Sequence, residues 1–247
     1  MKSKFILLSF TAIFCFNAWS DKTPPAQSLL VKSDKARGGI NDGISWEVEI
    51  TAFQDEEKKI SNFDIKVKSL NILAVCIAPA RQKGETYLFN DRNLWVYRSN
   101  LRKPISVSTR QRLSGQTANG DIATTNYAKD YEAQSIGEES VKGEKSYKLL
   151  LKSKSKDLTY DQIHYWISQK SGLAIQADFL TTEGKPFKRA NYMYANSISV
   201  AGKKEPFISE MIITETAFPE NKSVLKYKNL KSIKLADNIF NVNNLAR

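Results

Sequence analysis

The sequence predicts a mainly β fold, built as an antiparallel meander that forms either a barrel or a strongly curved open sheet. About ten segments after Gly43 are rich in β-branched and aromatic residues, as strands are. They follow one another without an amphipathic helix between them, which argues against a parallel sheet. No residue period recurs, so neither a propeller nor a solenoid is expected.

The first twenty residues have the three parts of a secretory signal peptide. Lys2 and Lys4 precede an apolar run at 5–19, and Ala18 and Ser20 are small residues at its end. The run is shorter than the roughly 20 apolar residues of a spanning helix, so we expect cleavage after Ser20 rather than an uncleaved membrane anchor. This signal predicts a soluble periplasmic protein.

Residues 21–43 are expected to form an N-terminal helix and linker. A short helix is predicted at 26–36, where Leu29, Leu30 and Val31 could pack on something larger. The glycines that follow predict a flexible connection. Residues 44–247 are then expected to form a single domain, because all-β domains of this size commonly stay single.

The first group of strands is predicted from alternation. Trp46, Val48 and Ile50 alternate with polar residues, which is the pattern of a strand with one solvated face. A charged turn is predicted at 55–59. The strand candidates in this part of the chain are residues 46–52, 63–67, 72–78, 87–89 and 94–97.

The stretch from Asn93 to Glu132 holds the most unusual composition in the chain. An aromatic strand and a short second strand, with Ile105 and Val107, lead into a long polar segment with glycines at Gly115 and Gly120. Connections this long without strong secondary structure are commonly lids or binding loops. We therefore expect residues 112–129 to cover a binding site.

The remaining strands are separated by dipeptides typical of hairpin turns, such as Lys142-Gly143 and Glu183-Gly184. The strand candidates here are residues 135–141, 147–152, 162–168, 174–181, 186–200, 207–216 and 223–232.

Charge and cysteine content narrow the class of partner. The formal net charge of +11 falls to +9 if residues 1–20 are removed, because they carry Lys2 and Lys4 and no acid. Such a charge suits anionic lipid or an acidic protein, although a solvated surface is an equal alternative. Nucleic acid is not expected for an exported protein. Cys76 would be the remaining cysteine, and its apolar surroundings predict a buried residue.

Candidate catalytic and metal-binding groups are scarce. His164 is the single histidine and lies in a strand pattern, where packing is the simpler role. A histidine-rich metal site is thereby excluded, and no glycine-rich phosphate motif is present. Asp121 closes the polar segment and could cap a short helix. An enzyme is therefore the weaker hypothesis, and we expect no catalytic residue, metal or cofactor.

Several short motifs, in order, carry a family resemblance. They are Leu94-Trp95-Val96-Tyr97, Gln111-Arg112 with Gly115, Gly120-Asp121, Asp130-Tyr131, Tyr165-Trp166-Ile167, Gly184-Lys185 with Lys188, and Ile239-Phe240 with Leu245. Over about residues 40 to 247 the chain resembles the outer-membrane lipoprotein-sorting proteins of the LolA-like superfamily. Within them it resembles a branch of exported proteins often associated with large membrane exporters.

This resemblance implies an incomplete, half-open β-barrel with a helical lid and a hydrophobic cavity for acyl chains. It also implies a carrier that uses no cofactor and moves lipid or lipoprotein cargo between the inner and outer membranes. An inner-membrane exporter or an outer-membrane acceptor protein would be its partner, and we expect a monomer.

The chain offers candidates for such a binding site. Its 4 Trp, 10 Tyr and 12 Phe could line a cavity, although an ordinary aromatic core is the simpler reading of any one of them. Our candidates for the cavity wall are Trp46, Trp95, Tyr97 and Trp166, and our candidates for head-group or lid contacts are Arg110, Arg112 and Asp121. Strand faces alternate, so about half of the wall candidates are expected to point away.

Two other functions stay open. An interaction module of the same fold, such as an envelope sensor or an accessory subunit of an exporter, would use the basic surface for docking. A hydrolase would need a catalytic base, for which the sequence offers only His164.

Overall fold

The computed structural model describes residues 24–39, 43–90, 93–122, 126–200 and 202–246. The predicted signal peptide at 1–20 lies outside these residues. Among the helices that are described, none combines the length and the apolar character needed to cross a membrane.

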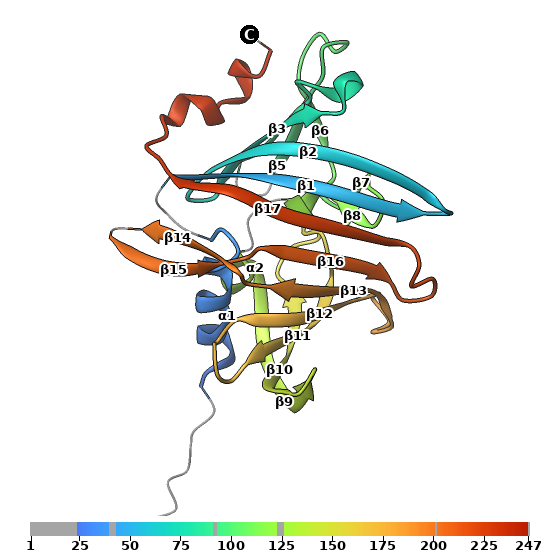
Figure 1. The fold of residues 1–247 in the computed structure, drawn as a ribbon, viewed down its shortest axis with the longest axis vertical. Helices are drawn as coiled ribbons and strands as arrows, with labels where there is room; N and C mark the ends of the chain where they lie inside the picture. The colour runs from blue at the N-terminus through green and yellow to red at the C-terminus, as the bar shows by residue number, and fades with distance from the viewer. Residues whose placement is uncertain (1–23, 40–42, 91–92, 123–125, 201, 247) are drawn as a thin grey trace, which may run out of the picture.

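Thirteen strands form one antiparallel sheet, in the order β6-β5-β4-β3-β2-β1-β17-β16-β13-β12-β11-β10-β9 (Figure 1). They are β1 (Ile44–Gln54), β2 (Glu57–Lys68), β3 (Asn71–Ala78), β4 (Thr86–Asn90), β5 (Asn93–Tyr97), β6 (Ile105–Val107), β9 (Tyr131–Val141), β10 (Glu144–Ser153), β11 (Gln162–Ser168), β12 (Ala174–Leu180), β13 (Pro186–Met193), β16 (Glu210–Glu215) and β17 (Lys222–Ser232).

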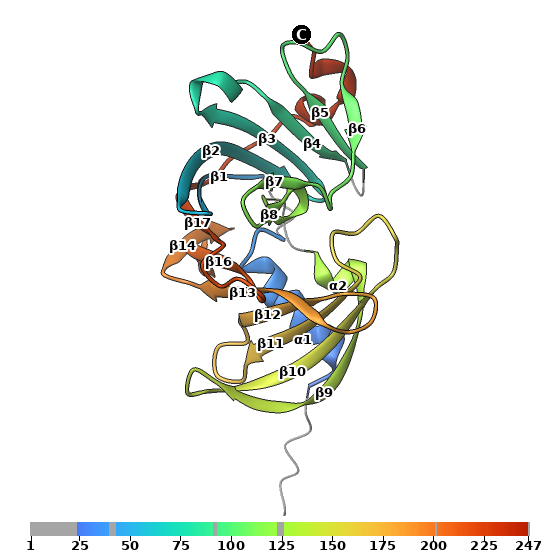
Figure 2. The ribbon, with the colours of Figure 1, turned by 90° about the vertical axis from the view of Figure 1, so that its right-hand side faces the viewer.

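The sheet is curved so strongly that its two ends turn toward each other. Figure 2 shows a first arm, β1 to β6, bent over a second arm, β9 to β13. The edge strands β6 and β9 do not pair with each other, so the sheet remains open across the described residues. The prediction of a mainly β fold with a curved antiparallel sheet that forms an incomplete barrel is confirmed.

The hydrophobic core lies on the concave side of the sheet. Strand β1 shows why: Trp46, Val48 and Ile50 are buried, and the residues between them are only partly covered. The antiparallel register with β2 places Trp46 opposite Ile65 and Val48 opposite Phe63, so both strands turn their apolar residues to the same side.

Helix α1 (Ala26–Lys35) fills part of the hollow of the second arm (Figure 2). It was predicted at 26–36. Leu30 is fully buried on the side that meets the core, whereas Val31 is exposed. The helix ends where Gly38 adopts a positive φ of 97°, a conformation that glycine reaches without strain.

Two predicted segments need correction. The strand predicted at 186–200 is two strands, because the chain turns after β13 and continues as β14 (Asn196–Val200), which pairs with β15 (Lys203–Phe207) in a separate hairpin. The side chain of Asn196 holds this turn by donating to Ile208 O at 2.9 Å and Tyr227 O at 2.8 Å. As Phe207 belongs to β15, the strand predicted at 207–216 begins only at Glu210.

The charged turn predicted at 55–59 is shorter than expected. Only Asp55 and Glu56 form it, with φ angles of 49° and 67°, and β2 starts at Glu57. Two consecutive residues with positive φ are what the type I′ turn of a two-residue hairpin requires.

The C-terminal segment covers β3 and β4 on the side turned away from the core. It contains the 3-10 helices η3 (Asp237–Phe240) and η4 (Val242–Asn244), and another, η1 (Ala80–Gln82), precedes β4. Phe240 is buried there, and Lys68 holds Asp237 at 2.6 Å. These helices lie where no strand was predicted.

Candidate functional site

The connection between the edge strands β6 and β9 crosses the open side of the sheet. We call its described residues, 108–122 and 126–130, the crossing segment. It contains a small hairpin of β7 (Arg112–Ser114) and β8 (Thr117–Ala118), then η2 (Asn119–Ile122) and α2 (Tyr127–Asp130). Figure 2 places β7, β8 and α2 between the two arms. The described residues of the predicted polar segment at 112–129 therefore lie at the opening, and their role as a cover stays a prediction.

The hairpin reaches back to the strands at the centre of the sheet. Gln116 N donates to Ser223 Oγ at 2.9 Å, and Lys188 Nζ donates to Gln116 O at 2.7 Å. Gly115 has a φ of 53°, and a Cβ atom there would lie 2.5 Å from Ala52 Cβ. The hairpin thus needs glycine at its turn, both for its conformation and for its close approach to β1.

The second contact of the crossing segment is with the connection between β10 and β11. Arg110 forms two hydrogen bonds with Asp161, at 2.8 and 2.6 Å, and Thr109 Oγ1 donates to Asp157 O at 2.9 Å. A Cβ atom on Gly120 would lie 2.0 Å from Thr159 Oγ1. The two connections therefore lie against each other on the open side.

The third contact joins α2 to α1 through polar groups. Asp34 Oδ2 accepts a hydrogen bond from Ala128 N at 2.8 Å. Gln27 donates to Ala128 O and to Tyr131 O, the latter at 3.2 Å, and accepts from Ala133 N at 3.3 Å. Helix α2 is thus hydrogen-bonded to a helix that lies inside the sheet.

A buried arginine lies between these helices and the sheet. Arg37, which follows α1, is only 9% exposed, and its Nη1 donates to Tyr165 Oη at 3.0 Å. Its guanidinium lies 4.2 Å from the ring centre of Tyr192 and 5.4 Å from that of Tyr127. Because a tyrosine ring carries negative potential on its face, these contacts stabilise the cation without a formal negative charge.

Buried polar atoms without a hydrogen-bond partner among the described residues gather around this arginine. They are Arg37 Nε, Asp34 Oδ1, Tyr192 Oη and Tyr194 Oη. Burial raises the pKa of Asp34 to about 8, although the Ala128 N–H and the Arg37 charge oppose the shift. Asp34 is therefore mostly protonated at neutral pH.

Asp121 sits at the centre of a second polar cluster. It accepts hydrogen bonds from Ala118 N at 2.8 Å and from Tyr160 Oη at 3.0 Å. Burial raises the pKa of Asp121, and it lowers the pKa of Lys188, which faces the same cluster. Tyr160 in turn stacks on Phe179, with ring centres 3.7 Å apart. The cluster fixes η2 onto the second arm.

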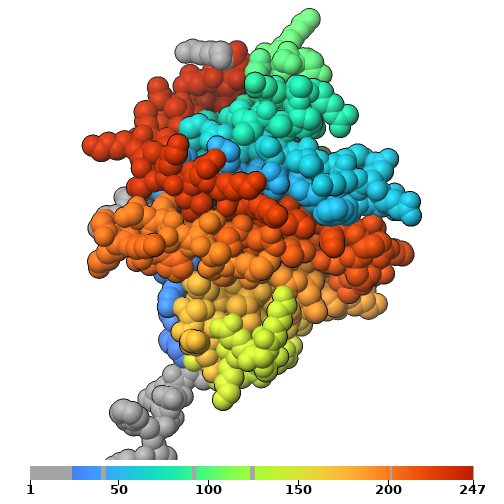
Figure 3. All heavy atoms as spheres, in the orientation of Figure 1, coloured from blue at the N-terminus to red at the C-terminus, as the bar shows by residue number. Residues whose placement is uncertain are grey.

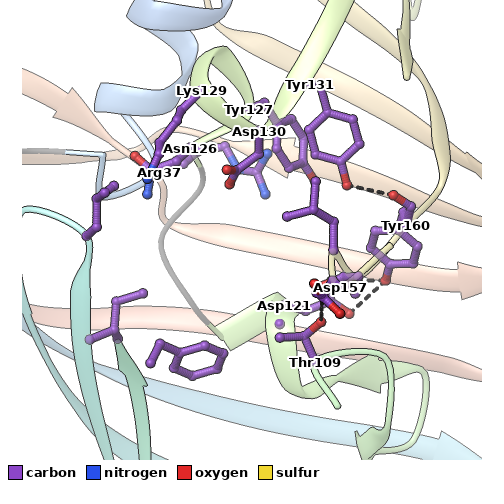
Figure 4. A pocket seen from close by; sticks show the side chains of 16 residues that line it. Arg37, Thr109, Asp121, Asn126, Tyr127, Lys129, Asp130, Tyr131, Asp157 and Tyr160 are labelled. Atoms are coloured by element: carbon purple, nitrogen blue, oxygen red, sulfur yellow. Dashed lines mark hydrogen bonds between the residues drawn. The ribbon is translucent and has the colours of Figure 1, made fainter. Parts of the chain in front are cut away.

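A cavity of about 100 Å³ lies under the crossing segment. Figure 4 shows Arg37, Tyr127, Asp121 and Tyr160 around it. Its apolar lining comes from Leu70, Ile72, Phe89 and Leu158. This volume is below the roughly 300–1,000 Å³ of typical small-molecule sites, so side chains fill most of the concave side in this conformation.

The structure does not bring the four predicted wall residues together. Trp46 lies in the core on the concave side, 5.5 Å from Phe207 between ring centres. Trp95 and Tyr97 alternate with the core residues Leu94 and Val96, so they point to the opposite face of β5.

Trp166 also points away from the core. Its indole N–H donates to Glu139 at 2.9 Å, and Lys148 Nζ lies 5.1 Å from its ring centre, on the outer face of the second arm. His164 lies on the same face, with its ring centre 6.1 Å from that of Trp166. We retain only Trp46 as a candidate for contact with a ligand on the concave side.

The predicted head-group or lid residues have different positions. Asp121 lines the cavity, Arg110 ties the crossing segment to Asp161, and Arg112 is exposed near Gln54, 3.5 Å between Nη1 and Oε1. A ligand contact by any of them stays a prediction. Across the described residues, no group of three acidic, histidine or cysteine side chains could hold a metal ion.

Sequence reasoning missed Arg37 and Asp34. In the sequence they are ordinary charges at the end of a short helix, where a cation is common because it suits the helix dipole. The available signal was the spacing of Ser33, Asp34 and Arg37, which follow the apolar Leu30 at helical intervals and so lie on the same side of the chain as Leu30.

Comparisons with known proteins show which family model matches the chain and which solved structures are similar to it. A family model described as "Uncharacterized protein" matches residues 69–247. The structure is similar to that of the LolA superfamily protein NE2245 from Nitrosomonas europaea, with 30% identity over 88% of this chain and 98% of the other, at a TM-score of 0.78. A search of curated proteins found no match.

Two more distant structures share the fold. A DUF1329 family protein from Desulfovibrio piger ATCC 29098 is 20% identical, with a TM-score of 0.74, over 89% of this chain and 97% of the other. A Vibrio parahaemolyticus domain named for outer membrane lipoprotein sorting is 18% identical, with a TM-score of 0.75, over 90% and 98% of the two chains.

Proposed function

Because the chain belongs to the LolA superfamily, we propose that it is a carrier for lipid or lipid-modified cargo, whose acyl chains it holds on the concave side of its sheet. The family membership supports a binding role rather than an enzymatic one. A lone histidine that lies on the outer face gives no support to a hydrolase.

The observation that carries this proposal is the way the apolar concave face is covered. A continuous apolar cluster from both arms lines it, and the crossing segment spans its open side. In that segment α2 is held by hydrogen bonds to Asp34 and Gln27, and Arg110 forms an ion pair with Asp161. Each such hydrogen bond contributes little net free energy of stabilisation, because water molecules take its place when the two groups separate. Such bonds suit a cover that must open.

The small size of the cavity means that further space must form when the cover opens. A volume of about 100 Å³ is far less than an acyl chain needs. On this proposal α2 moves away from the arms while the β7–β8 hairpin stays in place, and the acyl chain enters between apolar residues such as Ile72 and Phe89.

The proposal also includes a cellular location and a division of the chain into three segments. Residues 1–20 would be removed as a signal peptide, 21–43 would supply α1 and its linker, and 44–247 would form one lipid-binding domain in the periplasm. The protein would act as a monomer without a cofactor, and it would exchange cargo with an inner-membrane exporter or an outer-membrane acceptor.

Tryptophan quenching by brominated acyl chains tests the proposal. We would compare a variant that keeps Trp46 (Trp95→Phe with Trp166→Phe) with one that keeps Trp166 (Trp46→Phe with Trp95→Phe), both without residues 1–20. Quenching of Trp46 but not of Trp166 is expected, because only Trp46 lies on the concave side. Equal quenching of the two, or none in either, would contradict binding on this face.

An interaction module remains a second candidate because of one basic end of the molecule. The connections before β4 and β6 lie at the same end of the first arm, joined by Arg98 and Glu85 at 3.2 Å. Four exposed cations lie in them: Arg81, Lys83, Arg102 and Lys103. Figure 3 shows the connection between β5 and β6 projecting from the molecule. Capture of an envelope protein by lipid-free protein would favour this function over a carrier.

A further inference from the structure

The buried arginine offers a way to define the cargo more closely, on the premise that the protein is a carrier as proposed above. Burying an ion is costly unless charged or hydrogen-bonding groups replace its water. The ring contacts and the hydrogen bond of Arg37 come from tyrosines, which are neutral.

Acidic groups close to Arg37 do not simply neutralise it. The Arg37 charge favours the ionised form of Asp34, yet burial outweighs this effect and raises the pKa of Asp34 to about 8. Burial also raises the pKa of Asp121 on the far side of the cavity. Burial thus disfavours the charged form of both carboxyl groups, which leaves the positive charge of Arg37 less fully balanced than two ionised carboxylates would leave it. Asp130 and Asp157 also line the cavity, so an anion is expected close to Arg37 rather than elsewhere in the cavity.

Arg37 is the donor for an anion at this cavity. It lines the cavity, and its Nε is buried without a hydrogen-bond partner among the described residues, whereas Tyr192 and Tyr194 are not among the residues that line it. A guanidinium can hold a carboxylate or a phosphate through two parallel hydrogen bonds, which is stronger than a bond between neutral groups.

The cavity beside Arg37 has the size of a head group. Its volume of about 100 Å³ could hold a carboxylate or a phosphate. Part of its wall is apolar, with Leu70, Ile72 and Phe89. A charged head at Arg37 would leave the attached acyl chain beside that wall.

We propose that Arg37 is the head-group site of an anionic amphiphile, one that carries a carboxylate or a phosphate next to its acyl chain. Neutral acyl cargo would gain only the apolar contacts, whereas an anionic amphiphile would gain the arginine as well.

The test compares three probes with the same saturated chain, namely hexadecanoate, hexadecyl phosphate and hexadecanol. Their affinity for the delipidated protein would be measured at neutral pH by isothermal titration calorimetry. We expect at least one of the anions to bind about 10- to 100-fold more tightly than the alcohol, in line with the worth of charge-assisted hydrogen bonds. The tighter of the two anions identifies the head group.

Substitution of the arginine locates the effect. In Arg37→Gln the preference for an anion should fall to about threefold or less, whereas Arg37→Lys should retain part of it. The matched control is Arg189→Gln, because Arg189 is paired with Asp178 at 2.6 Å on the outer face and should leave the preference unchanged.

The outcomes separate this inference from the carrier function. Equal binding of all three probes to the unaltered protein would overturn the head-group site and leave the carrier in place. An anion preference that persists in Arg37→Gln would overturn it as well. Failure of every probe to bind would count against the carrier itself. If Arg37→Gln does not fold, the comparison of probes on the unaltered protein and on Arg37→Lys still decides.

Discussion

A single carboxyl group, that of Asp34, joins two roles at the residue scale. One oxygen accepts from Ala128 N and so links α2 to α1, and the other is buried without a partner among the described residues. The hydrogen bond favours the ionised form, but burial has the larger effect and raises the pKa to about 8. The group should therefore make the stability of the protein depend on pH.

We predict that Asp34→Asn removes a pH dependence that the unaltered protein shows. The pKa is 3.8 for an ordinary aspartate and about 8 in the folded chain, so between these values the folded state binds more protons than the unfolded state. The free energy of unfolding then falls as pH rises through this window. The amide cannot ionise, so the variant should gain relative stability from about pH 5 to about pH 8, on the order of a few kcal/mol.

Urea unfolding at both pH values measures this difference. The change in the gap between variant and parent is the readout, since an amide next to Arg37 can shift stability equally at every pH. Glu183→Gln, at an exposed turn, is the control that should show no such change. Parallel curves for Asp34→Asn and its parent would show that Asp34 is ionised in the folded protein.

Residue patterns explain why the strands could be predicted while their functional faces could not. Strand β11 matches its predicted range, 162–168, because Ile163, Tyr165 and Ile167 alternate and face the core. Trp166 lies between them, yet Glu139 and Lys148 bury it on the outer face. Because Trp166 is apolar like its neighbours in β11, the sequence pattern alone could not show that it lies on the outer face of the strand.

Arg37 was beyond prediction for a related reason. Its surroundings come from Tyr127, Tyr165 and Tyr192, which belong to three different elements. Only the curvature of the sheet brings these elements around the end of α1, and curvature leaves no local pattern in a sequence.

At the element scale, the β7–β8 hairpin is the part of the crossing segment most tightly fitted to the sheet. Its strands of three and two residues have no alternation long enough to detect, which is why the sequence predicted only a polar connection. Gln116, Thr117 and Ala118 are nevertheless buried. The hairpin therefore serves as a fixed end for any movement of the rest of the segment.

We predict that Gly115→Ala destabilises the protein by about 3 kcal/mol, from overpacking and from a strained backbone. A Cβ atom would lie 2.5 Å from Ala52 Cβ and 2.6 Å from Ser223 Oγ, at a φ of 53°. Gly184→Ala is the matched control, because its φ of 82° is also positive but nothing lies within 4 Å of the added atom. That variant should lose only about 1 kcal/mol.

The midpoint of urea unfolding, followed by tryptophan fluorescence, reports both variants. Equal losses would mean that backbone strain alone matters and that the hairpin can shift away from β1 and β17 at little cost.

At the scale of the whole molecule, a carrier that packs its own side chains into the binding space should be more stable when loaded. We predict that an anionic amphiphile at about 100 times its dissociation constant raises stability by about 2.7 kcal/mol. For a chain of this size, this corresponds to a rise in the unfolding midpoint of about 5–10 °C. Thermal unfolding of delipidated protein with and without hexadecanoate measures it. Butyrate, which has the same head group but a short chain, should give little or no rise, and an equal rise with butyrate would show that apolar contacts contribute nothing.

The position of β1 in the middle of the sheet has a consequence for how the protein folds during its synthesis. Its neighbours are β2, which follows at once, and β17, near the other end of the chain, where Lys228 meets Glu49 across 179 positions. When residue 221 has been synthesised, β1 still lacks one of its two partners. Strands so far apart in the sequence pair slowly, because the intervening chain must first lose conformational entropy. The protein should therefore leave the ribosome with its central strand pair unformed, so that the two arms can be joined only after translation is almost complete.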